Sequence, residues 1–176
     1  MKYSKFAAMI ITSTIAMFIM MYLNTYAVSH VWFSETRTYM ALYMGAGMAI
    51  VMLAFMLGMY NNKKLNVAIF LLAAVLFAVC LYLVRSQSTV SDTAYMKAMI
   101  PHHSIAILTS ERSKLKDVRV RELADGIIKA QRKEIKEMEW LIKDISENGK
   151  VTSQAEAEQR PLPEFQGKLS KGEQNE

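Results

Sequence analysis

The first half of the chain contains three long stretches without a charged side chain, over about residues 6–23, 39–60 and 65–84. As a helix rising roughly 1.5 Å per residue, each is about long enough to cross a hydrocarbon core of roughly 30 Å. Helices of globular proteins are seldom apolar on all sides, and three in succession are rarer still. The pattern predicts a membrane domain over residues 1–86 with three transmembrane helices, surrounded by membrane lipid.

After this apolar half, the pattern changes to that of amphipathic helices. Ser91–Thr93 offers N-cap candidates for a helix running to about Ser113, and Pro101 inside it predicts a kink or a break. A short connection leads to Asp117, the N-cap candidate of a second helix that runs to about Ser146. That helix has a stripe with alternating spacings of four and three, at Ala124, Ile128, Gln131, Ile135, Met138, Ile142 and Ile145. The short connection makes the two helices antiparallel neighbours.

Two helices alone cannot enclose a hydrophobic core, so the stripe must meet a second copy or the outer face of the membrane spans. Beyond residue 147 polar residues and proline dominate, which predicts a mostly disordered tail over residues 148–176. The predicted fold class is therefore all-α: three transmembrane helices, a helical hairpin over residues 91–147 that forms a four-helix bundle on dimerisation, and the tail.

The charges change how the basic composition is interpreted. The chain has 176 residues and a formal net charge of +5, and all of this excess lies in the apolar half, because acidic and basic side chains balance after Arg85. A neutral polar half gives no electrostatic footprint for DNA or RNA, so we expect no nucleic-acid partner. A single cysteine, Cys80, excludes a disulfide scaffold.

Basic residues also predict the orientation in the membrane. Lys2 and Lys5 precede the first stretch, and Lys63 and Lys64 lie in the turn between the second and third. The positive-inside rule therefore places the N-terminus in the cytoplasm, and three crossings place the hairpin in the periplasm or outside the cell. We expect a multi-pass protein of the inner (cytoplasmic) membrane. A cleaved signal peptide is the alternative for the first stretch, which is longer than a usual signal-peptide core.

The candidate chemistry lies in the first hairpin helix. Two of the three histidines of the chain, His102 and His103, follow Met96 and Met99. Helical spacing places both methionines on one side with His103, and His102 about 100° away. Met138 lies on the buried stripe of the second helix. Thioether and imidazole donors suit copper, whereas the structural alternative is that these methionines are core residues and the histidines face solvent.

Two specific patterns lie in this half of the chain. The first is Met96-x-x-Met99-x-Pro101-His102-His103, and the second is the helix pattern Gln131-x-x-Glu134-Ile135-x-x-Met138-x-Trp140-Leu141. With them, residues 93–143 resemble the domain-of-unknown-function 305 family. The resemblance implies ferritin-like helices, a link to copper binding and copper tolerance, and metal ligation by Met99, His102, His103 and Met138, with Met96 adjacent. The chain departs from the family at Ile105 and Thr109, where glycine and methionine are usual, so one thioether is missing.

The sequence therefore predicts a membrane protein whose hairpin binds a copper ion in metal homeostasis or tolerance. We do not expect an enzyme, because neither histidine of the pair has the acid three positions earlier that a ferritin-like di-metal centre requires. The alternative is a structural module without metal, in which the hairpin joins copies of a small membrane protein. In both cases we expect a homo-oligomer formed through the hairpin. We expect the remaining histidine, His30, to be an interface residue and not a ligand.

Overall fold

The computed structural model describes residues 2–169, which form six α-helices and two short 3-10 helices and contain no strand. An all-α fold is therefore confirmed for the described part of the chain. The chain divides into two compact units, which are described separately. Unit 1 comprises the chain up to Leu23 together with Ser34–Val90, and unit 2 comprises Asn24–Phe33 and the chain from Ser91 onward.

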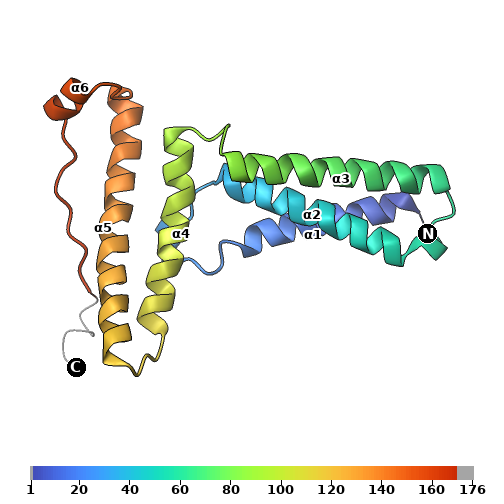
Figure 1. The fold of residues 1–176 in the computed structure, drawn as a ribbon, viewed down its shortest axis with the longest axis horizontal. Coiled ribbons are helices and arrows are strands. Elements are labelled where there is room, and N and C mark those ends of the chain that lie inside the picture. The colour runs from blue at the N-terminus through green and yellow to red at the C-terminus, as the bar shows by residue number, and fades with distance from the viewer. Residues whose placement is uncertain (1, 170–176) are drawn as a thin grey trace. The chain divides into compact units, whose positions relative to one another are not determined.

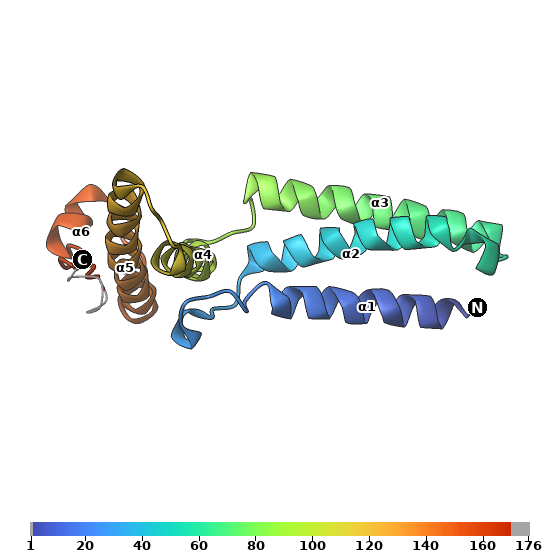
Figure 2. The ribbon, with the colours of Figure 1, turned by 90° about the horizontal axis from the view of Figure 1, so that it is seen from below.

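Unit 1 consists of three long helices that run side by side, α1 (Tyr3–Met20), α2 (Glu35–Phe55) and α3 (Lys63–Ser86) (Figures 1 and 2). The short 3-10 helix η2 (Leu57–Met59) lies between α2 and α3. α2 contacts both α1 and α3. Its buried face is made mostly of small residues, Ala41, Gly45, Ala46 and Ala49. Such residues allow helix backbones to approach closely.

All three helices of unit 1 are long and apolar enough to cross a membrane. The chain itself covers few of their side chains, and the share buried ranges from 6% in α1 to 28% in α2. A hydrophobic helix that its own chain leaves uncovered requires another apolar environment, so the three helices have the properties expected of membrane spans.

The hairpin of unit 2 consists of α4 (Asp92–Arg112) and α5 (Val118–Asn148), which lie side by side (Figure 1). Both predicted N-caps are present, since the Ser91 side chain accepts from the backbone N–H of Ala94 and the Asp117 side chain from that of Arg119. Pro101 does not break α4, which continues through it. Pro101 and its neighbour Ile100 are fully buried, and this packing offsets the hydrogen bond that a proline cannot donate.

Unit 2 also contains the connection between α1 and α2. The sequence pattern instead predicts that this connection belongs to the membrane domain of residues 1–86. This connection includes the 3-10 helix η1 (Val28–His30), and its Tyr26 and Trp32 pack against the hydrophobic core of the hairpin. The covering layer that two helices lack on their own therefore comes partly from the loop between the first two apolar helices.

The segment after α5 differs from the disordered tail that its composition predicted. It contains the short helix α6 (Gln154–Gln159) and continues beside α5 as far as residue 169 (Figure 1). The Arg160 guanidinium holds it there by donating to the backbone carbonyls of Asn148 and Gly149 and by pairing with Asp144 at 3.1 Å. These charge-assisted contacts compensate for the low apolar content of the segment. The predicted disorder of residues 170–176 lies outside the described residues.

Candidate functional site in the helical hairpin

The hydrophobic core of the hairpin positions the candidate residues. It is made of buried side chains that α4 and α5 supply in the predicted spacing, namely Met96, Ile100, Ile107, Ile128, Ile135, Met138 and Ile142. Three of the five predicted ligands belong to this region, because Met96 and Met138 are buried in the cluster and Met99 packs against it. The fold thus brings the thioethers of Met96, Met99 and Met138 to one cluster, where these side chains are also part of the hydrophobic core.

The two histidines have different surroundings. The His103 side chain is 14% exposed, and its Nδ1 lies 3.1 Å from Glu134 Oε2 on α5. His102 is exposed, and the two ring centroids are 6.2 Å apart. Because neighbouring residues of a helix point about 100° apart, the two histidines have different environments. His103 faces the contact between α4 and α5, and His102 faces solvent.

The electrostatic environment of His103 favours a neutral imidazole. Burial lowers the pKa of His103, the nearby Glu134 carboxylate opposes this shift, and the neighbouring His102 adds to it. Nδ1 is fully buried, and its approach to Glu134 lacks hydrogen-bond geometry. A neutral imidazole is the form that binds metal ions.

The donor set decides which metals suit this site. Among residues 2–169, no group of three or more histidine, cysteine and acidic side chains is arranged to hold a metal ion. A hard cation that needs several carboxylates therefore finds no such cluster there. The His103 imidazole and the thioethers that the same hairpin supplies would form a soft donor set, which is the type that Cu(I) prefers.

Comparison with known proteins adds the family. A family model described as Domain of unknown function (DUF305) matches residues 85–174, about half of the chain, which include α4, α5 and α6. The chain belongs to the DUF305 family. The family description assigns no activity.

An uncharacterised protein of Acanthamoeba polyphaga mimivirus is similar to this DUF305 protein, with 30% identity over 151 residues. The alignment covers 82% of this chain and 97% of the viral protein. Because the alignment is longer than the DUF305 region, the similarity extends into the apolar half. No solved structure matches the chain.

Sequence reasoning missed the contacts on the other side of α4 in the DUF305 region. The Ser104 hydroxyl is fully buried and accepts a hydrogen bond from the backbone N–H of Tyr26 at 2.7 Å. His30 Nδ1 lies 2.9 Å from the same hydroxyl. Burial lowers the pKa of His30, and Glu139 opposes the shift. Nothing in the sequence pattern named Ser104 as the partner of His30.

Arg132 connects the three segments of unit 2. Its guanidinium lies 3.0 Å from Glu111 of α4, stacks 5.5 Å from the ring centroid of Tyr26, and donates to the backbone carbonyl of Lys168. A cavity of about 490 Å³ lies beside it, lined in part by His30 and Ile107.

Proposed function

We propose that this DUF305 protein is an integral membrane protein whose α4–α5 hairpin binds copper and acts in metal homeostasis or tolerance. The observation that carries the proposal is the mostly buried imidazole of His103 on a hairpin that also gathers the three thioethers. Soft sulfur and imidazole donors together favour copper over the hard cations Mg²⁺ and Ca²⁺.

We assign different roles to the predicted ligands. His103 supplies the nitrogen donor, and Met99 and Met138 supply thioethers. Met96, in the same cluster, is an additional thioether. His102 is the solvent-facing donor that first captures the ion, because it is exposed and lies next to His103. Binding requires the thioethers to turn away from the core, which methionine permits because its side chain is unbranched and flexible.

The proposed location follows from the three apolar helices and the lysines near their ends. With Lys2 and Lys5 in the cytoplasm, three crossings of the inner membrane place the hairpin on the periplasmic or extracellular side. A copper site there serves sequestration of the ion or its handover before the ion enters the cell. We propose no catalytic role, because the sequence lacks the Glu-x-x-His pairs of ferritin-like di-metal enzymes.

Anaerobic titration of the full-length protein in detergent with Cu(I), in competition with a chromogenic chelator, tests the proposal. We expect His103→Ala to weaken binding by at least about tenfold, the lower limit of what loss of even an outer-shell partner costs. His30→Ala is the matched control, because His30 is also a partly buried histidine of unit 2 and is expected to leave the affinity unchanged. Equal affinity of the wild type and the His102→Ala/His103→Ala variant would refute copper binding at this site.

A further inference from the structure

The two sides of the hairpin are covered unequally. On one side, the loop of residues 24–33 contacts Ser104, and the tail accepts hydrogen bonds from Arg132 and from Lys136, whose Nζ lies 3.0 Å from the Gln166 carbonyl oxygen. On the other side of α5, Leu123 is 64% exposed and Ile127 is 36% exposed. Leu123 and Ile127 lie one turn apart and form a contiguous exposed apolar patch, which is typical of an interaction surface.

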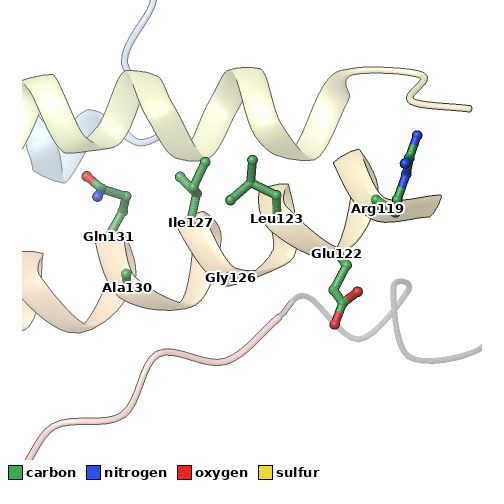
Figure 3. A pocket seen from close by; sticks show the side chains of 7 residues that line it. All are labelled: Arg119, Glu122, Leu123, Gly126, Ile127, Ala130 and Gln131. Atoms are coloured by element: carbon green, nitrogen blue, oxygen red, sulfur yellow. The ribbon is translucent and has the colours of Figure 1, made fainter. Parts of the chain in front are cut away.

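This uncovered side is hollowed into a groove of about 560 Å³ along the N-terminal half of α5. Figure 3 labels the residues that line it, Arg119, Glu122, Leu123, Gly126, Ile127, Ala130 and Gln131. Large apolar residues alternate there with small ones, because Leu123 and Ile127 are neighbours of Gly126 and Ala130. No atom lies within 4 Å of the position that a side chain on Gly126 would take, so the groove has room for a side chain from outside.

We propose that the groove binds a second copy of this chain, with the two α5 helices packed antiparallel around a two-fold axis near residues 126 and 127. In this register Leu123 lies opposite Ala130 of the second copy, and Ile127 lies opposite Gly126 of the second copy. Each large side chain therefore meets a small one, and the two-fold axis makes the same surface complementary to itself. Two hairpins joined in this way give four packed helices.

The charges select this register over its neighbours. Arg119 lies opposite Glu134 of the second copy. A slip of one turn in one direction brings Arg119 to Ala130 and leaves it without a carboxylate, and a slip in the other brings Leu123 to Glu134. An unpaired charge and a carboxylate over an apolar side chain are both less favourable, so the proposed register is favoured over these two because it pairs opposite charges and apolar groups together.

The required side chains are accessible in the single chain. Arg119 is 89% exposed and pairs only with Asp117 in the contacts described. Glu134 is 44% exposed while it contacts His103. The second copy therefore neutralises the carboxylate beside His103. This inference goes beyond the proposed function, because the assembly needs no copper.

Disulfide cross-linking in membranes tests the register. Leu123→Cys and Ala130→Cys are made separately in the full chain, each with Cys80→Ser, which removes the only native cysteine. The two variants carry different tags, are co-expressed, and are oxidised with iodine, because a copper oxidant would act on the proposed site. We expect a disulfide-linked heterodimer. Each variant alone is expected to give little product, since two identical positions lie about 10 Å apart along the antiparallel axis, beyond disulfide reach.

Charge reversal tests the selection of the register. Arg119→Glu is expected to lower the heterodimer yield about tenfold, and Arg119→Glu/Glu134→Arg to restore it, because the opposite charges are again paired. Lys129→Cys paired with Lys133→Cys is the control pair outside the proposed contact and is expected not to cross-link.

Three outcomes would overturn the proposal. The first is no heterodimer from the Leu123→Cys and Ala130→Cys mixture when both variants retain helical circular dichroism. The second is efficient cross-linking of either variant with itself. The third is protection of both cysteines from a maleimide reagent without cross-linking, which would assign the groove to lipid or to a different protein.

Discussion

The two units are built from the same secondary structure and bury opposite kinds of side chain. In unit 1, large apolar residues face away from the other helices, as Leu72 at 71% and Phe55 at 89% exposure show. In unit 2, Ile100, Ile107 and Ile128 are completely buried, and charges occupy much of the outer surface. Unit 2 therefore makes its own hydrophobic core, whereas the three apolar helices need an environment that the chain does not provide.

The contacts inside each unit follow from this difference. Lipid tails are as apolar as leucine, so helices in a membrane gain from close packing of small residues, such as Ala41 and Gly45 of α2. The hairpin carries charged side chains on much of its outer surface and gains from burying the apolar area of its isoleucines and methionines. Substitutions in the two units are thus expected to act through different mechanisms.

The largest expected effect is the loss of core area in the hairpin. Ile128→Ala leaves a cavity in a fully buried position and is expected to lower the free energy of unfolding of unit 2 by about 2–5 kcal/mol. Val75→Ala in α3, where the side chain is 60% exposed, is the matched control and is expected to cost less than about 0.5 kcal/mol. Urea unfolding of both variants in detergent measures the difference, and equal losses would contradict the comparison.

The next effect concerns the tail of unit 2. Arg160→Ala removes the ion pair with Asp144, whose side chain is only 10% exposed, and two hydrogen bonds to backbone carbonyls at the end of α5. The free energy of local opening of residues 149–160 is expected to fall by about 1.5–3 kcal/mol, the usual value of hydrogen bonds to charged groups. Hydrogen exchange measures it. Unchanged exchange would show that the tail is free in solution, as its composition alone predicts.

The sequence predicts the bounds of the helices in both units more closely than it predicts the contacts that these helices make. The boundaries of α4 and α5, the caps at Ser91 and Asp117, and the shared side of Met96, Met99 and His103 all follow from local spacing. The contacts that hold the hairpin against residues 24–33 do not, because they join residues more than seventy positions apart and leave no periodic pattern.

The position of the tail beside α5 was not predicted, for a related reason. Its polar composition is typical of disorder, and its position depends on a few charged and backbone contacts, above all those of Arg160. In the candidate site, helical spacing predicts that Met96, Met99 and His103 share one side of α4. It does not predict the contact of His103 with Glu134, because Glu134 lies on the other helix.

A smaller effect is expected in unit 1. A methyl group on Gly45 would collide with the Thr14 side chain of α1, so Gly45→Ala is expected to lower stability by about 1–3 kcal/mol. Thr14→Ala in the same chain removes the colliding atoms and is expected to restore most of the loss. Gly58→Ala is the control, because nothing lies within 4 Å of its added carbon. Thermal unfolding compares the variants, and no difference between the two glycines would contradict close packing of α1 on α2.

The smallest expected effect is a pH dependence of the loop on unit 2. Burial lowers the pKa of His30 in the folded chain, so its stabilising contribution is present above the unfolded pKa of about 6.5 and is lost as the pH falls below it. Protection of the amides of residues 24–33 from hydrogen exchange, corrected for the intrinsic rate, is therefore expected to decrease below that pH. His30→Asn is expected to lose this dependence while keeping a partner for Ser104. An identical pH profile in both proteins would exclude His30 as its cause.

The central claim is that the hairpin presents imidazole and thioether donors to one soft metal ion. X-ray absorption of the full-length protein loaded with one equivalent of Cu(I) tests it most directly, because nitrogen and sulfur neighbours scatter differently. We predict both imidazole nitrogen and sulfur around the copper, with loss of the nitrogen signal in His103→Ala and reduced sulfur scattering in Met138→Leu. A spectrum with oxygen and nitrogen neighbours only, or one that neither variant changes, would contradict the account.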